Sequence, residues 1–335
     1  MKKDRIIYLF YCVIVIVIFT FVAEKTLRVL GYRPWKPWTR NVRVEPGGKY
    51  FTKDPLLGYT QLPGKFKVTV DDKYIFNATH LASTLRITHP LPSYDNISLK
   101  PEIWIFGCSF TYGWRLNDKE TYPWILQEYL PNYEVVNFGV VGYGTLQALI
   151  QFKEAIKKKK PYLAIIAYAS LHDERNTFLR KRMKIVAAYN KLGPLIQPYA
   201  RLDYNNRLCF GVATAEYPEF PLMRHLSLVR WIEEKYDDIE DLFYRSHEVS
   251  KAIIKEISIL CKEDNVELIV AGIVSDPKTM DMLNYCKSQG ILTTDMAVDY
   301  SIDRNRLLDW HPSAVANKQI AEKLYIFLRN NVLKN

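Results

Sequence analysis

The stretch EIWIFGCSFTYG, residues 102–113, decides the fold of this chain. Residues 103–106 form a short unbroken apolar run, which is typical of a strand buried on both faces of a parallel sheet. Gly107 ends the run, and Ser109 follows where a helix begins. A serine at such a turn either caps the helix or presents its hydroxyl at the edge of the sheet. The stretch alone leaves both interpretations open.

The residues that follow alternate between apolar runs and amphipathic stretches. We expect further strands at 133–139, 161–169 and 266–273, and helices at 121–130, 145–159, 248–263 and 313–330. Strands that alternate with helices indicate a mostly parallel sheet covered on both faces. The sequence therefore predicts an α/β domain over residues 101–335, built as a three-layer α/β/α sandwich. Residues 178–247 are polar, aromatic and irregular, and we interpret them as an insertion or lid near the site.

An apolar run, IIYLFYCVIVIVIFTFVA, occupies residues 6–23 and holds no charge over its 18 residues. A bilayer core needs about 20 mostly apolar helical residues, so this run can serve as a transmembrane signal anchor. Three basic residues in the tail 1–5 precede it, which favours a cytoplasmic N-terminus and a periplasmic or extracellular remainder. A cleaved signal peptide is the alternative, although FTFVAEK is a poor cleavage site.

Residues 24–100 are rich in Pro, Gly and aromatic residues. The short alternating stretches KFKVTV (65–70) and KYIFNAT (73–79) are typical of strands joined by turns. We therefore expect a small, membrane-proximal β-rich segment between the anchor and the α/β domain. No catalytic group of residues is apparent in it.

The composition and charge of the chain limit the classes of partner that we expect it to bind. The chain has 335 residues and a net charge of +10, with 48% apolar and 24% charged residues, which is an ordinary globular balance. Basic clusters at 157–160 and 180–184 are either solvated surface or a face for anionic lipid or acidic polysaccharide. They do not resemble a nucleic-acid module, because they are not interleaved with stacking aromatics.

Metal and nucleotide cofactors are not expected. The histidines are scattered, and the five cysteines form no CxxC pair and no metal-like cluster. The sequence does not decide whether one disulfide forms among Cys209, Cys261 and Cys286. GVVGYG lacks the strand and helix context of a dinucleotide fingerprint.

Two polar motifs fall where a ligand would bind, at the carboxyl ends of the strands. Ser109 follows the first strand, and DWHPS (309–313) precedes the last helix. In this motif His311 can act as a base, and Asp309 can fix its tautomer and steady the imidazolium. Taken singly, each motif is also explained by helix capping.

Three blocks together resemble the SGNH (GDSL-type) hydrolase family. They are GCSFTYGW (107–114), VVNFGVVGYGT (135–145) and DWHPS, in the order of the first, second and last blocks of that family. The resemblance covers roughly residues 100–335 and leaves out the anchor and the β-rich segment. It implies an SGNH or flavodoxin-like fold and acyl chemistry.

The resemblance also implies a role for each site residue. Ser109 would be the nucleophile, His311 its base and Asp309 the residue that orients the base. The family usually has an aspartate before the serine, where this chain has Cys108. That difference raises the Cys108 thiol as an alternative nucleophile.

The oxyanion of the tetrahedral intermediate needs preorganised donors. By motif position these are the backbone N–H groups of Ser109 and Gly142 and a side chain from the third block. That block normally reads GxND, whereas this chain has YASLHDERN. His172 stands where the asparagine is expected, and Asn176 follows about one helical turn later. We favour His172 over Asn176, since an imidazole can also donate a hydrogen bond.

These motifs predict a serine esterase that acts on O-acyl, above all O-acetyl, esters of a carbohydrate or lipid outside the cytoplasm. Its substrate would be a small molecule or polysaccharide, and its membrane contact the single N-terminal helix. One alternative is an O-acyltransferase that uses the same triad to modify a polysaccharide. Another is a catalytically inactive SGNH-fold binding protein.

Overall fold

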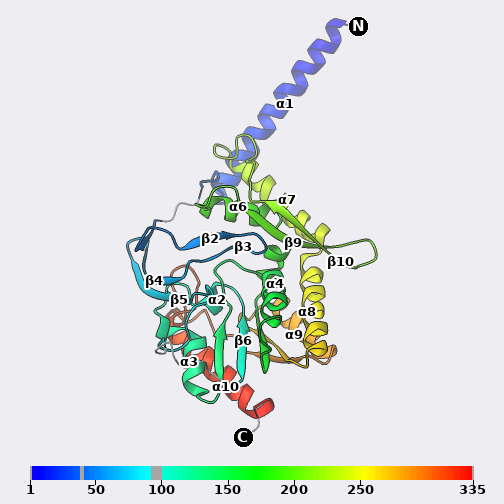
Figure 1. Ribbon diagram of the computed structural model, residues 1–335. Helices are drawn as coiled ribbons and strands as arrows, with labels where there is room; N and C mark the ends of the chain where they lie inside the picture. Colours follow the sequence, from blue (N-terminus) through cyan, green and yellow to red (C-terminus); the bar gives the residue numbers. More distant parts are fainter. Residues whose placement is uncertain (1, 38–40, 92–99, 334–335) are drawn as a thin grey trace. The chain divides into compact units, whose positions relative to one another are not determined.

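The computed structural model describes all residues except 1, 38–40, 92–99 and 334–335 (Figure 1). The chain forms two units. The anchor unit consists of Met1–Thr39, Leu179–Tyr189 and Glu216–Phe243. The sheet unit consists of Arg40–Phe178, Asn190–Ala215 and Tyr244–Asn335.

A five-stranded parallel sheet is the centre of the sheet unit. Its strands are β6 (Glu102–Phe106), β7 (Glu134–Asn137), β8 (Leu163–Tyr168), β11 (Glu267–Gly272) and β12 (Leu292–Asp295). They lie in the order β12-β11-β8-β6-β7, and every neighbouring pair is parallel. Counted along the chain this is the order 2-1-3-4-5 of flavodoxin-like folds, whose ligands bind at the carboxyl ends of the strands around the point where the order reverses. The predicted fold class is confirmed.

Helices cover both faces of this sheet. α3 (Tyr122–Tyr129) and α10 (Ala314–Asn331) pack on one face, and α4 (Thr145–Ile156), α8 (Ser246–Glu263) and α9 (Pro277–Ser288) pack on the other. Successive side chains of a strand point to opposite faces. Accordingly, Ile103 and Ile105 of β6 pack on the face covered by α3 and α10. Trp104 and Phe106 pack on the face covered by α4, α8 and α9. This double burial is why β6 is apolar from Ile103 to Phe106.

The antiparallel strands between residues 42 and 80 confirm the small β-rich segment. They are β1 (Val42–Glu45), β2 (Phe51–Asp54), β3 (Gly58–Gln61), β4 (Gly64–Val70) and β5 (Tyr74–His80). β1, β4 and β5 form one sheet and β2 and β3 another. Phe66 and Phe76 bury their rings in a core that also contains Tyr112 and Trp114, just beyond Ser109. The segment is thus built into the sheet unit beside the first block.

Residues 178–247, interpreted from the sequence as an insertion or lid, contain regular elements. These residues form α6 (Arg180–Tyr189), the hairpin strands β9 (Ile196–Leu202) and β10 (Leu208–Thr214), and the long α7 (Ser227–Tyr244). α9 and β12 were also missed by the sequence analysis. Short elements complete the fold: α2 (Ser109–Tyr112), η1 (Asp118–Glu120), α5 (His172–Thr177) and η2 (Asp303–Asn305).

The anchor unit begins with α1 (Lys2–Val29). Over Arg5–Val29 this helix is long and apolar enough to cross a membrane, and none of its most apolar window is buried within the protein. All five cysteines, each within the described part of the chain, are free, so the disulfide left open by the sequence is not formed.

Candidate active site

Ser109 lies in a tight turn directly after β6. Cys108 is extended, α2 spans only four residues, and Gly113 ends it in the left-handed region at φ 81°. Gly107 is needed for close packing, because a Cβ there would meet the Thr111 side chain. Cys108 is completely buried in the core, so the alternative of a thiol nucleophile is wrong.

His311 and Asp309 lie beside Ser109. His311 Nε2 is 3.0 Å from Ser109 Oγ, across 202 positions of the chain. On the other side of the ring, His311 Nδ1 is 3.0 Å from Asp309 Oδ2. His311 Nε2 is therefore within hydrogen-bonding distance of the Ser109 hydroxyl, and the Asp309 carboxylate lies beside the other ring nitrogen.

The loop before α10 holds the imidazole in place. Leu307 donates its backbone N–H to the His311 carbonyl at 2.8 Å, and Trp310 adopts φ 66°. Ser313 then caps α10 by accepting from the Ala316 N–H. A left-handed backbone is costly for a tryptophan, so the contacts of the surrounding loop must hold Trp310 in this conformation. The same loop contacts fix the position of the His311 ring.

Arg115 is a site residue that the sequence analysis missed. Its guanidinium Nε is 3.3 Å from Asp309 Oδ2, and Nη2 is 3.4 Å from Asp71 Oδ2. The guanidinium also lies over the Tyr74 ring, 4.3 Å from its centroid. The Leu308 N–H donates to the Tyr74 hydroxyl at 3.2 Å. The β-rich segment therefore contacts the loop that carries Asp309.

The second block packs against α2. Asn137 donates its amide N–H to the Thr111 carbonyl at 3.1 Å and accepts from the Gly139 N–H at 2.9 Å. A Cβ on Gly139 would lie 2.5 Å from the Tyr112 backbone nitrogen, so only glycine fits. Gly142 turns the loop at φ 88°, again in the glycine region.

The third block separates its two candidate donors. Both N–H groups of the Asn176 amide are used, by Thr145 Oγ1 at 2.7 Å and Ser250 Oγ at 2.8 Å, and its oxygen accepts from the Leu146 N–H. Asn176 ties α5 to α4 and α8, and its amide has no N–H left for an oxyanion. The expectation that it could serve as a donor is wrong.

His172 differs sharply from Asn176. It is 1% exposed, and neither ring nitrogen has a hydrogen-bond partner among the described residues. Burial, together with the positive charge of Arg175, holds the pKa of this imidazole well below 6.5, so the ring is neutral. A neutral imidazole keeps one N–H to donate. Buried polar groups without a partner are rare and call for an explanation.

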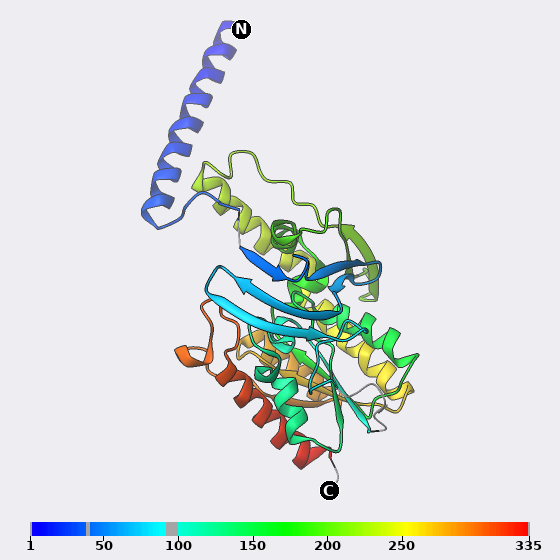
Figure 2. The same ribbon diagram turned by 60° about the vertical axis from the view of Figure 1, so that its left-hand side comes forward.

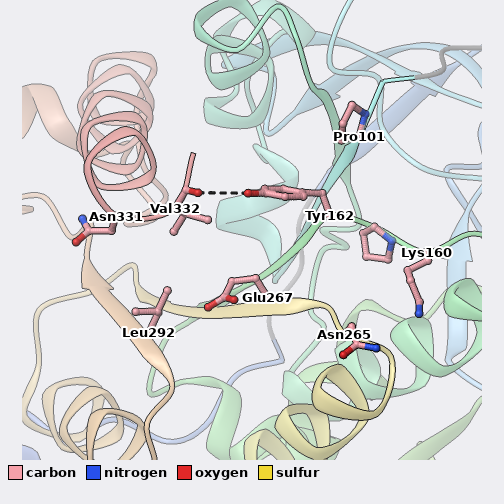
Figure 3. A pocket seen from close by; sticks show the side chains of 9 residues that line it. Pro101, Lys160, Tyr162, Asn265, Glu267, Leu292, Asn331 and Val332 are labelled. Atoms are coloured by element: carbon pink, nitrogen blue, oxygen red, sulfur yellow. Dashed lines mark hydrogen bonds between the residues drawn. The ribbon is translucent and has the colours of Figure 1, made fainter. Parts of the chain in front are cut away.

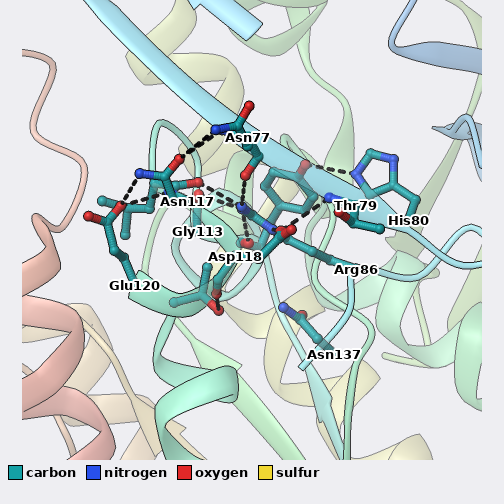
Figure 4. A network of polar contacts seen from close by, with 12 residues as sticks. Asn77, Thr79, His80, Arg86, Gly113, Asn117, Asp118, Glu120 and Asn137 are labelled. Atoms are coloured by element: carbon teal, nitrogen blue, oxygen red, sulfur yellow. Dashed lines mark hydrogen bonds and ion pairs between the residues drawn. The ribbon is translucent and has the colours of Figure 1, made fainter. Parts of the chain in front are cut away.

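A buried arginine fixes the end of the Ser109 turn (Figure 4). Arg86 donates to the carbonyls of Tyr112 at 2.9 Å, Gly113 at 2.7 Å and Leu116 at 2.6 Å. Its Nε is 2.9 Å from Asp118 Oδ1, and its side chain is completely buried. Arg86 thus holds the turn from the side of the β-rich segment.

His80 adds to the same network. Its Nδ1 is 2.7 Å from the Leu62 carbonyl and its Nε2 is 2.8 Å from the Tyr112 hydroxyl. Burial lowers the pKa of His80 to about 4 and raises that of Tyr112 to about 12. Both groups are therefore neutral near pH 7.

A cavity of about 630 Å³ lies at the opposite edge of the sheet (Figure 3). Pro101, Glu267 and Leu292 line it at the amino ends of β6, β11 and β12, and Tyr162 donates across it to the Val332 carbonyl at 3.3 Å. It is remote from Ser109. In the described parts of the chain, no group of three or more His, Cys, Asp or Glu side chains is placed to hold a metal ion.

The sequence matches no family model and no curated protein. Its structure is similar to several solved ones. TesA is 10% identical over 68% of this chain and 98% of its own, with a TM-score of 0.42. A GDSL-like lipase from Bacteroides thetaiotaomicron VPI-5482 is 12% identical over 71% and 92%, with a TM-score of 0.39.

An acetyl xylan esterase, AlAXEase, is 11% identical over 68% of this chain and all of its own, with a TM-score of 0.39. Such values are too low to carry a functional argument. The fold follows instead from the parallel strand order and from the placement of the first and last blocks at one edge of the sheet. The sheet unit has the three-layer α/β/α fold that the resemblance to SGNH hydrolases implied.

Proposed function

We propose that this protein is an SGNH-type serine esterase that cleaves O-acyl esters, above all O-acetyl esters, of a carbohydrate or lipid outside the cytoplasm. The observation that carries the proposal is the contact of 3.0 Å between His311 Nε2 and Ser109 Oγ, with Asp309 at 3.0 Å on the other side of the ring. Acyl transfer through serine requires a hydroxyl, a base and a carboxylate that orients the base.

The reaction follows from this geometry. Ser109 Oγ attacks the ester carbonyl carbon while His311 Nε2 takes its proton. By motif position, the backbone N–H groups of Ser109 and Gly142 and the neutral His172 ring would stabilise the resulting oxyanion. Collapse breaks the bond to the alcohol, which leaves with the proton from His311. Water, deprotonated by His311, then attacks the acyl carbon. The bond from that carbon to Ser109 Oγ breaks, His311 returns the proton to Oγ, and the acid is released.

The surface beside the triad suits a sugar ring or an acyl chain. Trp310 is 60% exposed and Leu308 is 77% exposed, and they flank Asp309 in the chain. An exposed indole with an apolar face and a polar edge can bind a ring that has both characters. This supports a substrate larger than the acyl group.

The test uses the full chain in mild detergent or nanodiscs. We expect it to release acetate from nitrophenyl acetate and from an O-acetylated polysaccharide, and the Ser109→Ala variant to release none above background. Equal rates for the wild type and the variant would overturn the proposal. Acetyl appearing on an added acceptor sugar, without free acetate, would show that transfer rather than hydrolysis is the reaction.

A further inference from the structure

The surface of α7 is unusual for a helix of a soluble domain. Ile232, Ile239 and Leu242 expose 47%, 65% and 77% of their surface, whereas Glu233 is fully buried. Tyr236, 47% exposed, continues the same line. Ile232, Tyr236 and Ile239 follow each other at intervals of four and three residues, which places them on one face of a helix.

The buried Glu233 carboxylate identifies the face of α7 that packs inside the anchor unit. Glu233 is 3.0 Å from Arg180 of α6, and it also pairs with Lys184 and with the Tyr217 hydroxyl. α6 thus covers α7 through charge-assisted contacts. Of the apolar line, Tyr236 packs its ring 6.1 Å from that of Phe220. All four side chains of the line nevertheless remain 47% to 77% exposed.

Hydrogen bonds join the start of α7 to the end of the apolar helix α1. Both oxygens of the Glu24 carboxylate, near the end of α1, accept backbone N–H groups of α7: from Ser227 at 3.1 Å and from Leu228 at 2.9 Å. Arg28 donates to the His225 carbonyl at 3.0 Å. If α1 spans a bilayer, α7 begins where the chain leaves it. In both ribbon views α7 runs across the direction of α1 (Figures 1 and 2).

We propose that α7 lies in the interface of the same bilayer that α1 spans, with the line Ile232, Tyr236, Ile239 and Leu242 against the lipid. This inference goes beyond the esterase function and rests on the membrane anchor. A helix that lies across the spanning helix is parallel to the membrane plane, and its 18 residues cover about 27 Å of it. Apolar side chains of such a helix enter the boundary between headgroups and acyl chains.

Basic residues lie close to the end of the apolar run and to the start of α7. Lys25, Arg28, Arg33 and Lys36 follow the apolar run closely, and Arg224 lies just before α7. Basic side chains next to a spanning helix are attracted to anionic lipid. The bilayer is favoured over a second copy of the chain as the occupant, because α7 begins at the end of the apolar helix α1. α7 itself carries six acidic and two basic residues, so its contact with lipid is made by the apolar side chains.

The experiment places a polarity-sensitive fluorophore on α7 in the full chain. Cys12 and Cys209 are replaced by Ser, and a cysteine is introduced by Ile239→Cys or, as the matched control, by Asp238→Cys. The Asp238 side chain is 65% exposed and pairs with Lys235. Each labelled protein is reconstituted in vesicles of phosphatidylcholine and phosphatidylglycerol. Lipids that carry a nitroxide at the top of the acyl chain serve as quenchers, and ester hydrolysis confirms the fold.

We expect the probe at position 239 to be blue-shifted and quenched several-fold more than the probe at position 238. Equal, weak quenching at both positions would overturn the proposal. So would a probe at position 239 that is shielded from lipid but becomes exposed when the protein is diluted in excess vesicles, since this would identify a second copy as the partner. Loss of hydrolysis with normal quenching would count against the esterase alone.

Discussion

One oxygen of Asp309 is shared between a cation and the imidazole: Arg115 Nε lies 3.3 Å from Asp309 Oδ2, and His311 Nδ1 lies 3.0 Å from that same oxygen. The Arg115 and Asp309 side chains are only 2% and 8% exposed, so water screens this contact weakly. Arg115 is thus a positioning residue. It holds the carboxylate and takes part of its negative charge away from His311.

We expect Arg115→Met to lower kcat with little change in KM, because the Asp309 carboxylate loses the contact that fixes its orientation toward His311. Arg115→Lys should restore part of the rate, since an ammonium group can still pair with the carboxylate. Steady-state kinetics measures both effects. Equal losses of kcat in the two variants, with no rescue by lysine, would show that the contact is only structural.

Arg86 should contribute strongly to stability. Arg86→Met leaves three buried carbonyls and the Asp118 carboxylate without their donor, which typically costs about 3 to 5 kcal/mol. Urea unfolding of the full chain in detergent measures this free energy. The matched control is Arg43→Met, because the ion pair of Arg43 with Asp72 is over 60% exposed on both sides and should be worth about 0 to 1 kcal/mol. Equal losses in the two variants would refute the role given to Arg86.

His80 predicts a pH dependence of stability. Burial lowers its pKa from 6.5 to about 4 in the folded chain, so between these values the unfolded chain binds a proton that the folded chain does not. The free energy of unfolding should therefore fall as the pH falls from about 6.5 to about 4, by up to about 1.4 kcal/mol per pH unit. His172 acts in the same direction. His80→Gln should flatten the slope, and an unchanged slope would contradict this explanation.

His172 is expected to act on the transition state. His172→Ala should lower kcat about 100- to 1000-fold with little change in KM, as for the loss of one oxyanion donor. His172→Asn should keep more activity, because an amide can also donate. Asn176→Ala is the contrasting variant, since it should lower stability and leave kcat of the folded fraction close to normal. Full activity of His172→Ala in steady-state assays would remove this residue from the oxyanion hole.

The sequence predicted those elements of the fold whose residue pattern follows a local rule. Buried parallel strands such as β6 are apolar on both faces, and the turn after each strand carries the polar motif, so Ser109 and His311 could be placed at one edge of the sheet without coordinates. β12 was missed because its sequence, LTTD, lacks the apolar run of an interior strand, and the strand lies at the edge of the sheet. α9, which precedes β12 in the chain, was missed with it.

The supporting residues could not be found in this way. Arg86 and Arg115 act on main-chain carbonyls and on a carboxylate that lie some thirty to two hundred positions away, and no local pattern records such contacts. α7 was read as part of an irregular insertion, although Ile232, Tyr236 and Ile239 recur at helical spacing. What could not be foreseen is the burial of Glu233 among charged and polar partners on α6 and at Tyr217.

Covalent labelling tests the central claim, that the hydroxyl of Ser109 is activated by His311. The folded full chain is treated with a fluorophosphonate, digested and sequenced by mass spectrometry. We predict a single phosphonate adduct on Ser109, formed much more slowly in His311→Ala and absent from Ser109→Ala. Folded wild-type protein that takes up no label, or that carries it on another residue, would contradict the account.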